Sequence, residues 1–149
     1  MNKLIIAKVL KSIGLHSSES VDLIFETGVH ESSGYKHRRQ MGGGPALGYW
    51  QMETATHEDC WDNFLKYKPT LSAKILTTSG LNSRPEATEL INNDAYAICM
   101  CRVKYLRAKG AIPTTIEGRA KYWKDNYNTV KGKGTVEKYL NDNAKYKPS

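Results

Sequence analysis

Apolar residues recur every three or four positions along most of the chain, with polar residues between them. This spacing predicts amphipathic helices. One helix is expected within residues 1–16, and Gly14 is typical of the position after a helix end. The serines of 17–20 suit the start of a second helix, which leads to Glu31. The apolar positions of the two stripes are Leu4, Ile5, Val9, Leu10 and Ile13, then Val21, Ile24, Phe25 and Gly28.

Helical patterns return after residue 55. Thr56 and Thr114 are each followed by an acidic residue three positions on, which is typical of a capped helix start. The expected helix starts are Thr56, Pro85, Asn93 or Asp94, Thr114 and Thr135, with a further short helix over 71–76. Residues 33–50 are expected to form a long cleft loop or a small β element. The pattern therefore predicts one mainly α domain over 1–149, with a flexible tail at 145–149.

Glu31 stands where the apolar stripe of the second helix ends. Three residues beyond Gly28, it falls on the same helical face as Ile24 and Gly28. A carboxylate at the edge of a core is partly desolvated, and this raises its pKa. A carboxylic acid that keeps its proton near neutral pH can protonate a leaving group. The alternative is a helix-terminal glutamate that bends out to solvent, because charged residues are rarely fully buried.

The segment after Glu31 combines glycines, aromatic rings and an amide. Glycine loses much backbone entropy on ordering, so the run over 42–44 suits a backbone that a ligand approaches closely. Tyr35, Tyr49 and Trp50 offer flat faces to sugar rings. Gln51 offers both hydrogen-bond donors and an acceptor. Beside an acid, these residues favour a polysaccharide-binding cleft.

Three motifs resemble those of the lytic transglycosylases of the lysozyme superfamily. The first is the pair Glu31-Ser32. The second is 48–56, which is similar to the family segment Gly-Leu-Met-Gln-x-x-Pro-x-Thr, with Tyr, Trp and Thr in place of Leu, Met and Pro. The third is Tyr127-Asn128 followed by Gly132 and Gly134. The resemblance covers residues 20–140. The sequence around Arg39-Gln40 is similar to that of a phage-type branch of the superfamily.

The resemblance implies a lysozyme-like catalytic domain that cleaves the β-1,4 bond between N-acetylmuramic acid and N-acetylglucosamine in peptidoglycan. It implies that Glu31 acts first as acid and then as base, and that the product closes an internal anhydro ring. Ser32 is implied to orient Glu31, and no cofactor is implied. The substrate-binding residues that the resemblance implies are Ser32, Tyr49, Gln51, Met52, Tyr127 and Asn128.

Two alternatives to this function stay open. A hydrolytic muramidase normally needs a second carboxylate. Glu53, Glu58 and Asp59 are the candidates, and none lies in a matching motif. This favours the transglycosylase without excluding hydrolysis. The other alternative is a wall-binding or virion structural module that keeps the fold without activity; the presence of Glu31 favours the enzyme.

The composition of the chain limits the kinds of partner that it is expected to bind. The chain has 22 Lys+Arg against 15 Asp+Glu, a formal net charge of +7. This balance favours an anionic partner such as a cell-wall polymer, although evenly spread charge is also typical of a solvated surface. No helix-turn-helix, zinc finger or aromatic RNA-binding motif is present, so nucleic acid is not expected. The spacing of His30, His37, His57 and Cys60 matches no zinc-site pattern, so no metal is expected.

The cysteines and the N-terminal residues bear on localisation. Cys60, Cys99 and Cys101 make an odd number, which argues against a disulfide framework and fits a reducing cytoplasm. Lys8 and Lys11 interrupt the N-terminal apolar run, so no signal peptide is expected. The expectation is a monomer made in the host cytoplasm, without stable membrane insertion, that acts on the periplasmic wall. Release as an endolysin, holin-dependent delivery and mounting on a virion all stay open.

Overall fold

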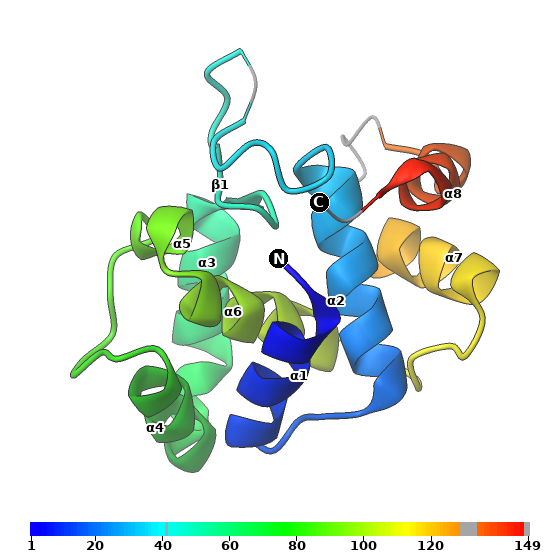
Figure 1. The fold of residues 1–149 in the computed structure, drawn as a ribbon. Coiled ribbons are helices and arrows are strands. Elements are labelled where there is room, and N and C mark those ends of the chain that lie inside the picture. Colours follow the sequence, from blue (N-terminus) through cyan, green and yellow to red (C-terminus); the bar gives the residue numbers. More distant parts are fainter. Residues whose placement is uncertain (41, 129–133, 148–149) are drawn as a thin grey trace.

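Helices form most of the computed structural model, which describes residues 1–40, 42–128 and 134–147 (Figure 1). The expectation of a mainly α fold is confirmed. None of the helices in these ranges is long and apolar enough to cross a membrane. In chain order the elements are α1 Lys3–Ser12, α2 Ser18–Glu31, β1 Ala46–Leu47, β2 Met52–Glu53, α3 Thr54–Asn63, the 3-10 helix η1 Leu65–Tyr67, α4 Pro69–Thr78, α5 Glu89–Asn92, α6 Asp94–Leu106, α7 Ile116–Asn126 and α8 Val136–Lys145.

Helix α2 runs through the middle of the molecule and contacts α1, α6, α7 and α8 (Figure 1). Its start is capped as the serine-rich sequence predicts. The Ser17 hydroxyl accepts a bond from the Ser20 backbone N–H, and the Ser20 hydroxyl accepts one from the Ser17 N–H. Because α2 has neighbours on several sides, its buried residues exceed the single predicted stripe and include Glu26 and Thr27.

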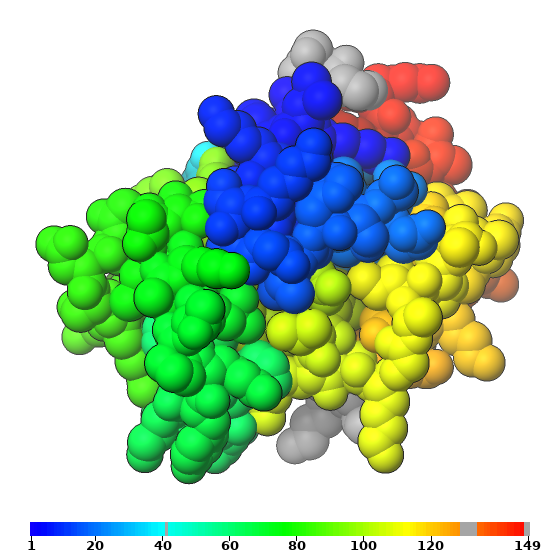
Figure 2. Space-filling model, turned by 90° about the horizontal axis from the view of Figure 1, so that it is seen from below, coloured from blue at the N-terminus to red at the C-terminus, as the bar shows by residue number. Residues whose placement is uncertain are grey.

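Helix α1 begins close to the predicted position but buries a different face. Leu4 and Ile5 are 81% and 46% exposed, so the expected stripe is wrong at these two residues. The true stripe keeps the i, i+3, i+4, i+7 spacing, starting at Ile6. Figure 2 shows this side of the molecule, where the blue N-terminal segment lies between the green 60–90 segment and the yellow 105–120 segment. The buried face of α1 and the turn after it consists of Ile6, Val9, Leu10 and Ile13.

Three predicted helix starts are wrong, at Thr56, Thr114 and Pro85. Helix α3 starts at Thr54, directly after β2 and without a side-chain cap, so Thr56 lies inside its first turn. Helix α7 is capped by Thr115, one residue after the predicted Thr114. Pro85 starts no helix, and the chain enters α5 four residues later.

Two other predicted caps are confirmed. The Asn93 side chain accepts a bond from the Tyr96 N–H, which starts α6. The Thr135 hydroxyl accepts a bond from the Lys138 N–H, which starts α8. Each cap satisfies one backbone donor that has no partner within its helix. Polar residues just before an apolar-periodic run were therefore reliable signals at both helices.

One hydrophobic cluster extends from Ile6 in α1 to Tyr139 in α8. Helix α6 supplies its centre, with every residue from 96 to 101 no more than 3% exposed. Cys60, Cys99 and Cys101 are buried free thiols. Burial raises the pKa of Cys99 to about 12, so this thiol is unreactive at neutral pH.

The small β element lies near the predicted place. Strands β1 and β2 pair antiparallel, with Ala46 opposite Glu53 and Leu47 opposite Met52. Arg39 adds an isolated bridge to Leu47. This hairpin brings the 48–51 turn close to the end of α2, the region in which the candidate acid lies (Figure 1).

Tyr146, which lies within the predicted flexible tail, contacts two aromatic rings. The Tyr146 ring lies 5.6 Å from the Phe25 ring and 6.0 Å from the Tyr35 ring, measured between centroids. Aromatic pairs at this distance are attractive beyond their buried area. Tyr146 is therefore packed against α2 and the turn that follows it.

Candidate active site

Glu31 is the last residue of α2 and is half-buried. Ile24 and Gly28, which share its helical face, are buried as the stripe predicts. The Trp123 indole Nε1–H, from α7, donates a hydrogen bond of 2.9 Å to Glu31 Oε2. Glu31 therefore points into the junction between α2 and α7 and is not the freely solvated glutamate of the alternative interpretation.

The electrostatics of Glu31 follow from this position. Burial raises the pKa of Glu31 from 4.5 to about 7, and the hydrogen bond from Trp123 opposes part of that rise. Burial wins because removing water penalises the charged carboxylate more than one neutral donor stabilises it. The expectation of a raised pKa is confirmed. At neutral pH this carboxyl group can both give and accept a proton.

A strained turn follows Glu31 immediately. Ser33, Gly34 and Tyr35 have φ values of 57°, 80° and 61°, so three successive residues lie in the left-handed region. Each non-glycine residue held there costs on the order of 1–3 kcal/mol, and such residues cluster at functional sites. Among the described residues, the remaining non-glycine residue with positive φ is Gln51, in the turn before β2. The backbone strain therefore gathers around Glu31.

Ser32 holds the strained turn in place. Its hydroxyl donates to the Gly28 carbonyl oxygen and accepts from the Tyr35 backbone N–H, both at 2.6 Å. The side chain is fully buried. Ser32 thus positions the residues on both sides of Glu31, in line with the orienting role implied for it. It offers no exposed atom to a sugar, so its predicted place among the substrate contacts is corrected.

Gly28 leaves space for the Tyr35 side chain. A Cβ atom there would clash with the Tyr35 phenol. The Tyr35 hydroxyl crosses this point to donate a 2.8 Å bond to the Phe25 carbonyl oxygen. Because Gly28 leaves this space free, the turn can fold back over the end of α2.

Hydrogen bonds of Trp50 join the hairpin turn to α2 and to Tyr127. The buried Trp50 donates from Nε1 to the Ile24 carbonyl oxygen at 2.8 Å. The Tyr127 hydroxyl donates to the Trp50 carbonyl oxygen at 2.5 Å. The three segments that carried the family resemblance, separated by up to 96 positions from Glu31 to Tyr127, are therefore joined through Trp50. Trp50, one of the rings expected to offer a face to sugars, belongs to the core.

The predicted substrate contacts divide into two groups by exposure. Met52 and Tyr127 are buried, and the Tyr127 ring stacks on Tyr105 at 5.1 Å between centroids. Both residues therefore support the site from inside, and their predicted contact with sugar is corrected for that reason. The residues that keep accessible surface are Tyr49, Gln51 and Asn128.

The partly exposed candidates are held in defined positions. The Arg38 guanidinium lies 4.1 Å from the centre of the Tyr49 ring and also pairs with Asp94. Gln51 donates from Nε2 to the Gly48 carbonyl oxygen at 2.8 Å. Asn128 donates from Nδ2 to the Gly134 carbonyl oxygen at 3.3 Å. Gly132, the other glycine of the third motif, lies outside the described residues.

Two of the three candidate second carboxylates form ion pairs with arginine side chains. Glu58 pairs with Arg84, and its pKa is lowered by a hydrogen bond from His57 and by Arg84. Asp59 pairs with Arg107. Glu53 is exposed at the end of β2 and forms no ion pair within the part of the chain that the structure describes.

Trp123 is the functional residue that sequence reasoning missed. Trp123 lies in α7 and is fully buried. The signal was chemical, because a buried indole N–H needs an acceptor. The spacing did not reveal that this acceptor is a carboxylate 92 positions earlier.

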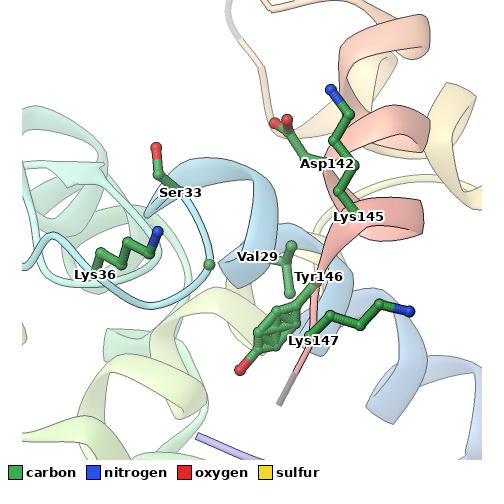
Figure 3. Close-up of a pocket in the computed structure, with 8 residues that line it drawn as sticks. Val29, Ser33, Lys36, Asp142, Lys145, Tyr146 and Lys147 are labelled. Atoms are coloured by element: carbon green, nitrogen blue, oxygen red, sulfur yellow. The ribbon is translucent and has the colours of Figure 1, made fainter. Parts of the chain in front are cut away.

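A hollow of about 380 Å³ lies beside the strained turn, between Ser33 and Lys36 on one side and the end of α8 on the other (Figure 3). Glu31 does not line it. Among residues 1–40, 42–128 and 134–147, no three His, Cys, Asp or Glu side chains gather as metal ligands would. The His57 ring lies instead between Glu58 and Tyr96.

Comparisons with known proteins add no relative. No family model, no curated protein and no solved structure matches this chain. The resemblance to lytic transglycosylases therefore rests on the short motifs and on the contacts that their residues make.

Gly48 and Gly42 form a matched pair for testing how tightly the hairpin turn packs against α5. Both have positive φ, but a Cβ at Gly48 would clash with the Leu90 carbonyl oxygen, whereas a Cβ at Gly42 meets nothing within 4 Å. We expect Gly48→Ala to destabilise the protein by roughly 1–3 kcal/mol more than Gly42→Ala, because backbone must move to relieve the overlap. Urea denaturation of the two variants measures the difference. Equal midpoints and slopes would mean that the hairpin turn does not press on α5.

Proposed function

We propose that this protein is a peptidoglycan-cleaving enzyme of the lysozyme-like superfamily, of phage type, and that it acts as a lytic transglycosylase. The observation that carries the proposal is the Glu31 carboxyl group. It is half-buried, has a pKa of about 7 and accepts one hydrogen bond from Trp123. A single carboxyl group with these properties suits a reaction in which one residue is acid and then base.

The proposed reaction uses Glu31 twice. Protonated Glu31 gives its proton to the oxygen that links N-acetylmuramic acid to N-acetylglucosamine, and the bond from the sugar C1 to that oxygen breaks. The Glu31 carboxylate then takes the proton of the muramic acid C6 hydroxyl. The C6 oxygen bonds to C1 and closes the 1,6-anhydro ring. Glu31 ends protonated, ready for the next cycle, and no water is consumed.

Several contacts support this proposal beyond the acid itself. The Glu31-Ser32 pair and the 48–56 segment are joined because Trp50 bonds to α2, and Tyr127 bonds to Trp50. Tyr49 and Gln51 keep accessible surface on the hairpin, where an aromatic face and an amide suit a sugar and its acetamido group. The net charge of +7 suits the anionic wall. We extend the proposal to a protein made in the host cytoplasm that acts on the periplasmic wall.

Hydrolysis is the second candidate function, and Glu53 is the observation that favours it. Glu53 is exposed at the end of β2, unlike the ion-paired Glu58 and Asp59. A carboxylate in that position could activate a water molecule, as a hydrolytic glycosidase requires. In that case Glu53→Gln would abolish cleavage. Under the transglycosylase proposal the same variant keeps most of its activity, and the release of soluble fragments from purified peptidoglycan distinguishes the two.

The pH dependence of cleavage tests the proposed role of Glu31. The proton donor must be protonated in the free enzyme, and Glu31 keeps its proton below a pKa of about 7. We therefore expect kcat/KM on a soluble glycan to be highest below pH 7 and to fall roughly tenfold per pH unit well above it. A falling limb centred near 4.5, the ordinary pKa of a glutamate, would contradict a buried acid.

Trp123→Phe tests whether the Trp123 hydrogen bond affects the pH dependence of kcat/KM. It keeps an aromatic ring beside Glu31 but removes the N–H that donates to Oε2. Because this bond lowers the pKa of Glu31, its loss should move the falling limb to higher pH. An unmoved limb would show that Trp123 does not act on the titrating group.

A further inference from the structure

The Trp123 indole, which donates to Glu31, is held by three neighbours among the described residues. The His30 ring meets it edge-on at 4.5 Å between centroids, and the Tyr139 ring lies 5.2 Å away. At Gly134 a Cβ atom would fall 2.5 Å from the indole Cη2, so a side chain there would displace the ring. The direction of the indole N–H is therefore set by packing on both sides.

His30 is itself fixed in orientation. Its Nδ1 lies 2.7 Å from Asp142 Oδ2, and its side chain is only 8% exposed. A carboxylate accepts, so Nδ1 carries the proton and Nε2 is left as the acceptor atom. Asp142 also receives the Lys138 ammonium at 3.2 Å. Burial lowers the pKa of His30 and Asp142 opposes that effect, so at neutral pH a neutral imidazole donates from Nδ1–H to the Asp142 carboxylate.

Asp142 connects this arrangement to solvent. Its carboxylate lies on the α8 side of the hollow beside the strained turn (Figure 3). Four side chains thus stand in sequence from that hollow to the candidate acid. They are Asp142, His30, Trp123 and Glu31, joined by a hydrogen bond, an edge-to-face ring contact and a second hydrogen bond.

We propose that His30 is a positioning residue, which Asp142 orients and which holds the Trp123 indole N–H on the Glu31 carboxylate. The inference rests on the proposed function, because it takes Glu31 as the acid. The hydrogen-bond partner of the His30 side chain in the described part of the chain is Asp142, and that of Glu31 Oε2 is Trp123, so His30 acts on Glu31 through the indole. Among the described residues, the charged and titratable groups that face it are Asp142 and Lys138, and Tyr139 packs on its ring from the same helix.

His30→Ala tests the inference through the titration of Glu31. Two effects oppose each other when the indole is released. Loss of its hydrogen bond raises the pKa of Glu31, whereas entry of water lowers it. Burial is the larger cause of the present value, so we expect a net fall. A fall of about one pH unit would lower the protonated fraction at pH 7 roughly fivefold, and kcat/KM with it.

The readout is NMR and does not depend on substrate. Carbon-13 labelling of the Glu side chains follows the Glu31 carboxyl through its titration, and the Trp123 indole N–H resonance should change in step with it near pH 7. In His30→Ala the carboxyl should titrate at lower pH, and the indole resonance should no longer follow it. Asp142→Ala should shift the titration in the same direction by a smaller amount, because the ring remains but is no longer oriented.

The controls separate positioning from general damage. His30→Phe keeps a ring edge against Trp123, so the coupled titration should persist in it even though the Asp142 bond is lost. Asp22→Asn breaks the exposed Lys3–Asp22 ion pair on the same helix and should leave both resonances unchanged. If Glu31 and the indole titrate as in the wild type in both His30→Ala and Asp142→Ala, the inference is wrong. Absence of peptidoglycan cleavage by the wild type would instead refute the proposed function, without altering these spectra.

Discussion

Glu31→Gln should lower turnover on purified peptidoglycan by a factor on the order of 10²–10⁴, because the amide keeps the shape of the side chain but has no proton to transfer. The Trp123 indole can still donate to the amide oxygen, so the local structure should be kept. Initial rates of fragment release, measured below pH 7 where wild-type Glu31 is protonated, give the ratio.

The stability of the same variant serves as its control. The folded protein holds the Glu31 proton up to a pKa of about 7, whereas the unfolded chain releases it near 4.5. The folded state therefore binds more protons in this window, and stability declines as pH rises from 4.5 through 7. Glu31→Gln removes that decline, so the variant should melt at the same temperature as the wild type at pH 4 and higher at pH 8. A variant that retains wild-type turnover would exclude Glu31 as the acid.

Breaking the buried Glu26–Arg119 ion pair should have the largest effect on stability. Arg119 donates from Nε and Nη2 to the two Glu26 oxygens at 2.9 and 2.8 Å, and both side chains are less than a tenth exposed. The Tyr139 hydroxyl adds a third bond to Glu26. Removing one partner leaves a buried charge without compensation, so Arg119→Ala should cost about 3–5 kcal/mol of unfolding free energy.

The exposed Lys3–Asp22 pair provides the comparison. It joins α1 to α2, its side chains are 52% and 32% exposed, and removing it should cost about 0–1 kcal/mol. Replacing Glu26 and Arg119 together with Leu and Met should cost less than removing either alone, because no lone charge remains. Chemical denaturation of the wild type and of each of these variants measures the losses of unfolding free energy. Equal losses for the buried and exposed pairs would show that Glu26–Arg119 does not lock α2 to α7.

The Glu26–Arg119 ion pair also explains how the fold positions the candidate site. Glu26 lies on α2 five residues before Glu31, and Arg119 lies on α7 four residues before Trp123. The ion pair therefore fixes the same two helices that meet again at the Trp123–Glu31 hydrogen bond. Tyr139 ties α8 to this point and also packs on Trp123.

Local chemistry explains which parts of this structure were predictable from sequence. The caps at Ser17, Asn93 and Thr135 follow from residues within three or four positions of each other, so their signals are complete in the sequence. The position of Glu31 at the edge of the core follows from the register of one helix. Thr56 failed as a cap because α3 starts at Thr54, directly after strand β2 of the β1–β2 hairpin, and the signal at Thr56 does not include that pairing.

The remaining features depend on contacts between distant residues. The Glu26–Arg119 pair joins positions 93 apart, and nothing in the spacing of either helix identifies the partner. The burial of Tyr127 follows from a hydrogen bond to the Trp50 backbone, which the motif itself cannot show. For the same reason the sequence indicated a site around Glu31 but not the His30–Trp123 contact behind it.

The most direct test of the central claim is mass spectrometry of the soluble fragments that the purified protein releases from peptidoglycan. If Glu31 is the single acid and base, the wild type should release fragments that end in 1,6-anhydro-N-acetylmuramic acid, each one water lighter than a hydrolysis product, and Glu31→Gln should release almost none. Fragments with reducing ends would contradict the transglycosylase reaction. No fragments from the wild type, or the same fragments from Glu31→Gln, would contradict the role of Glu31 itself.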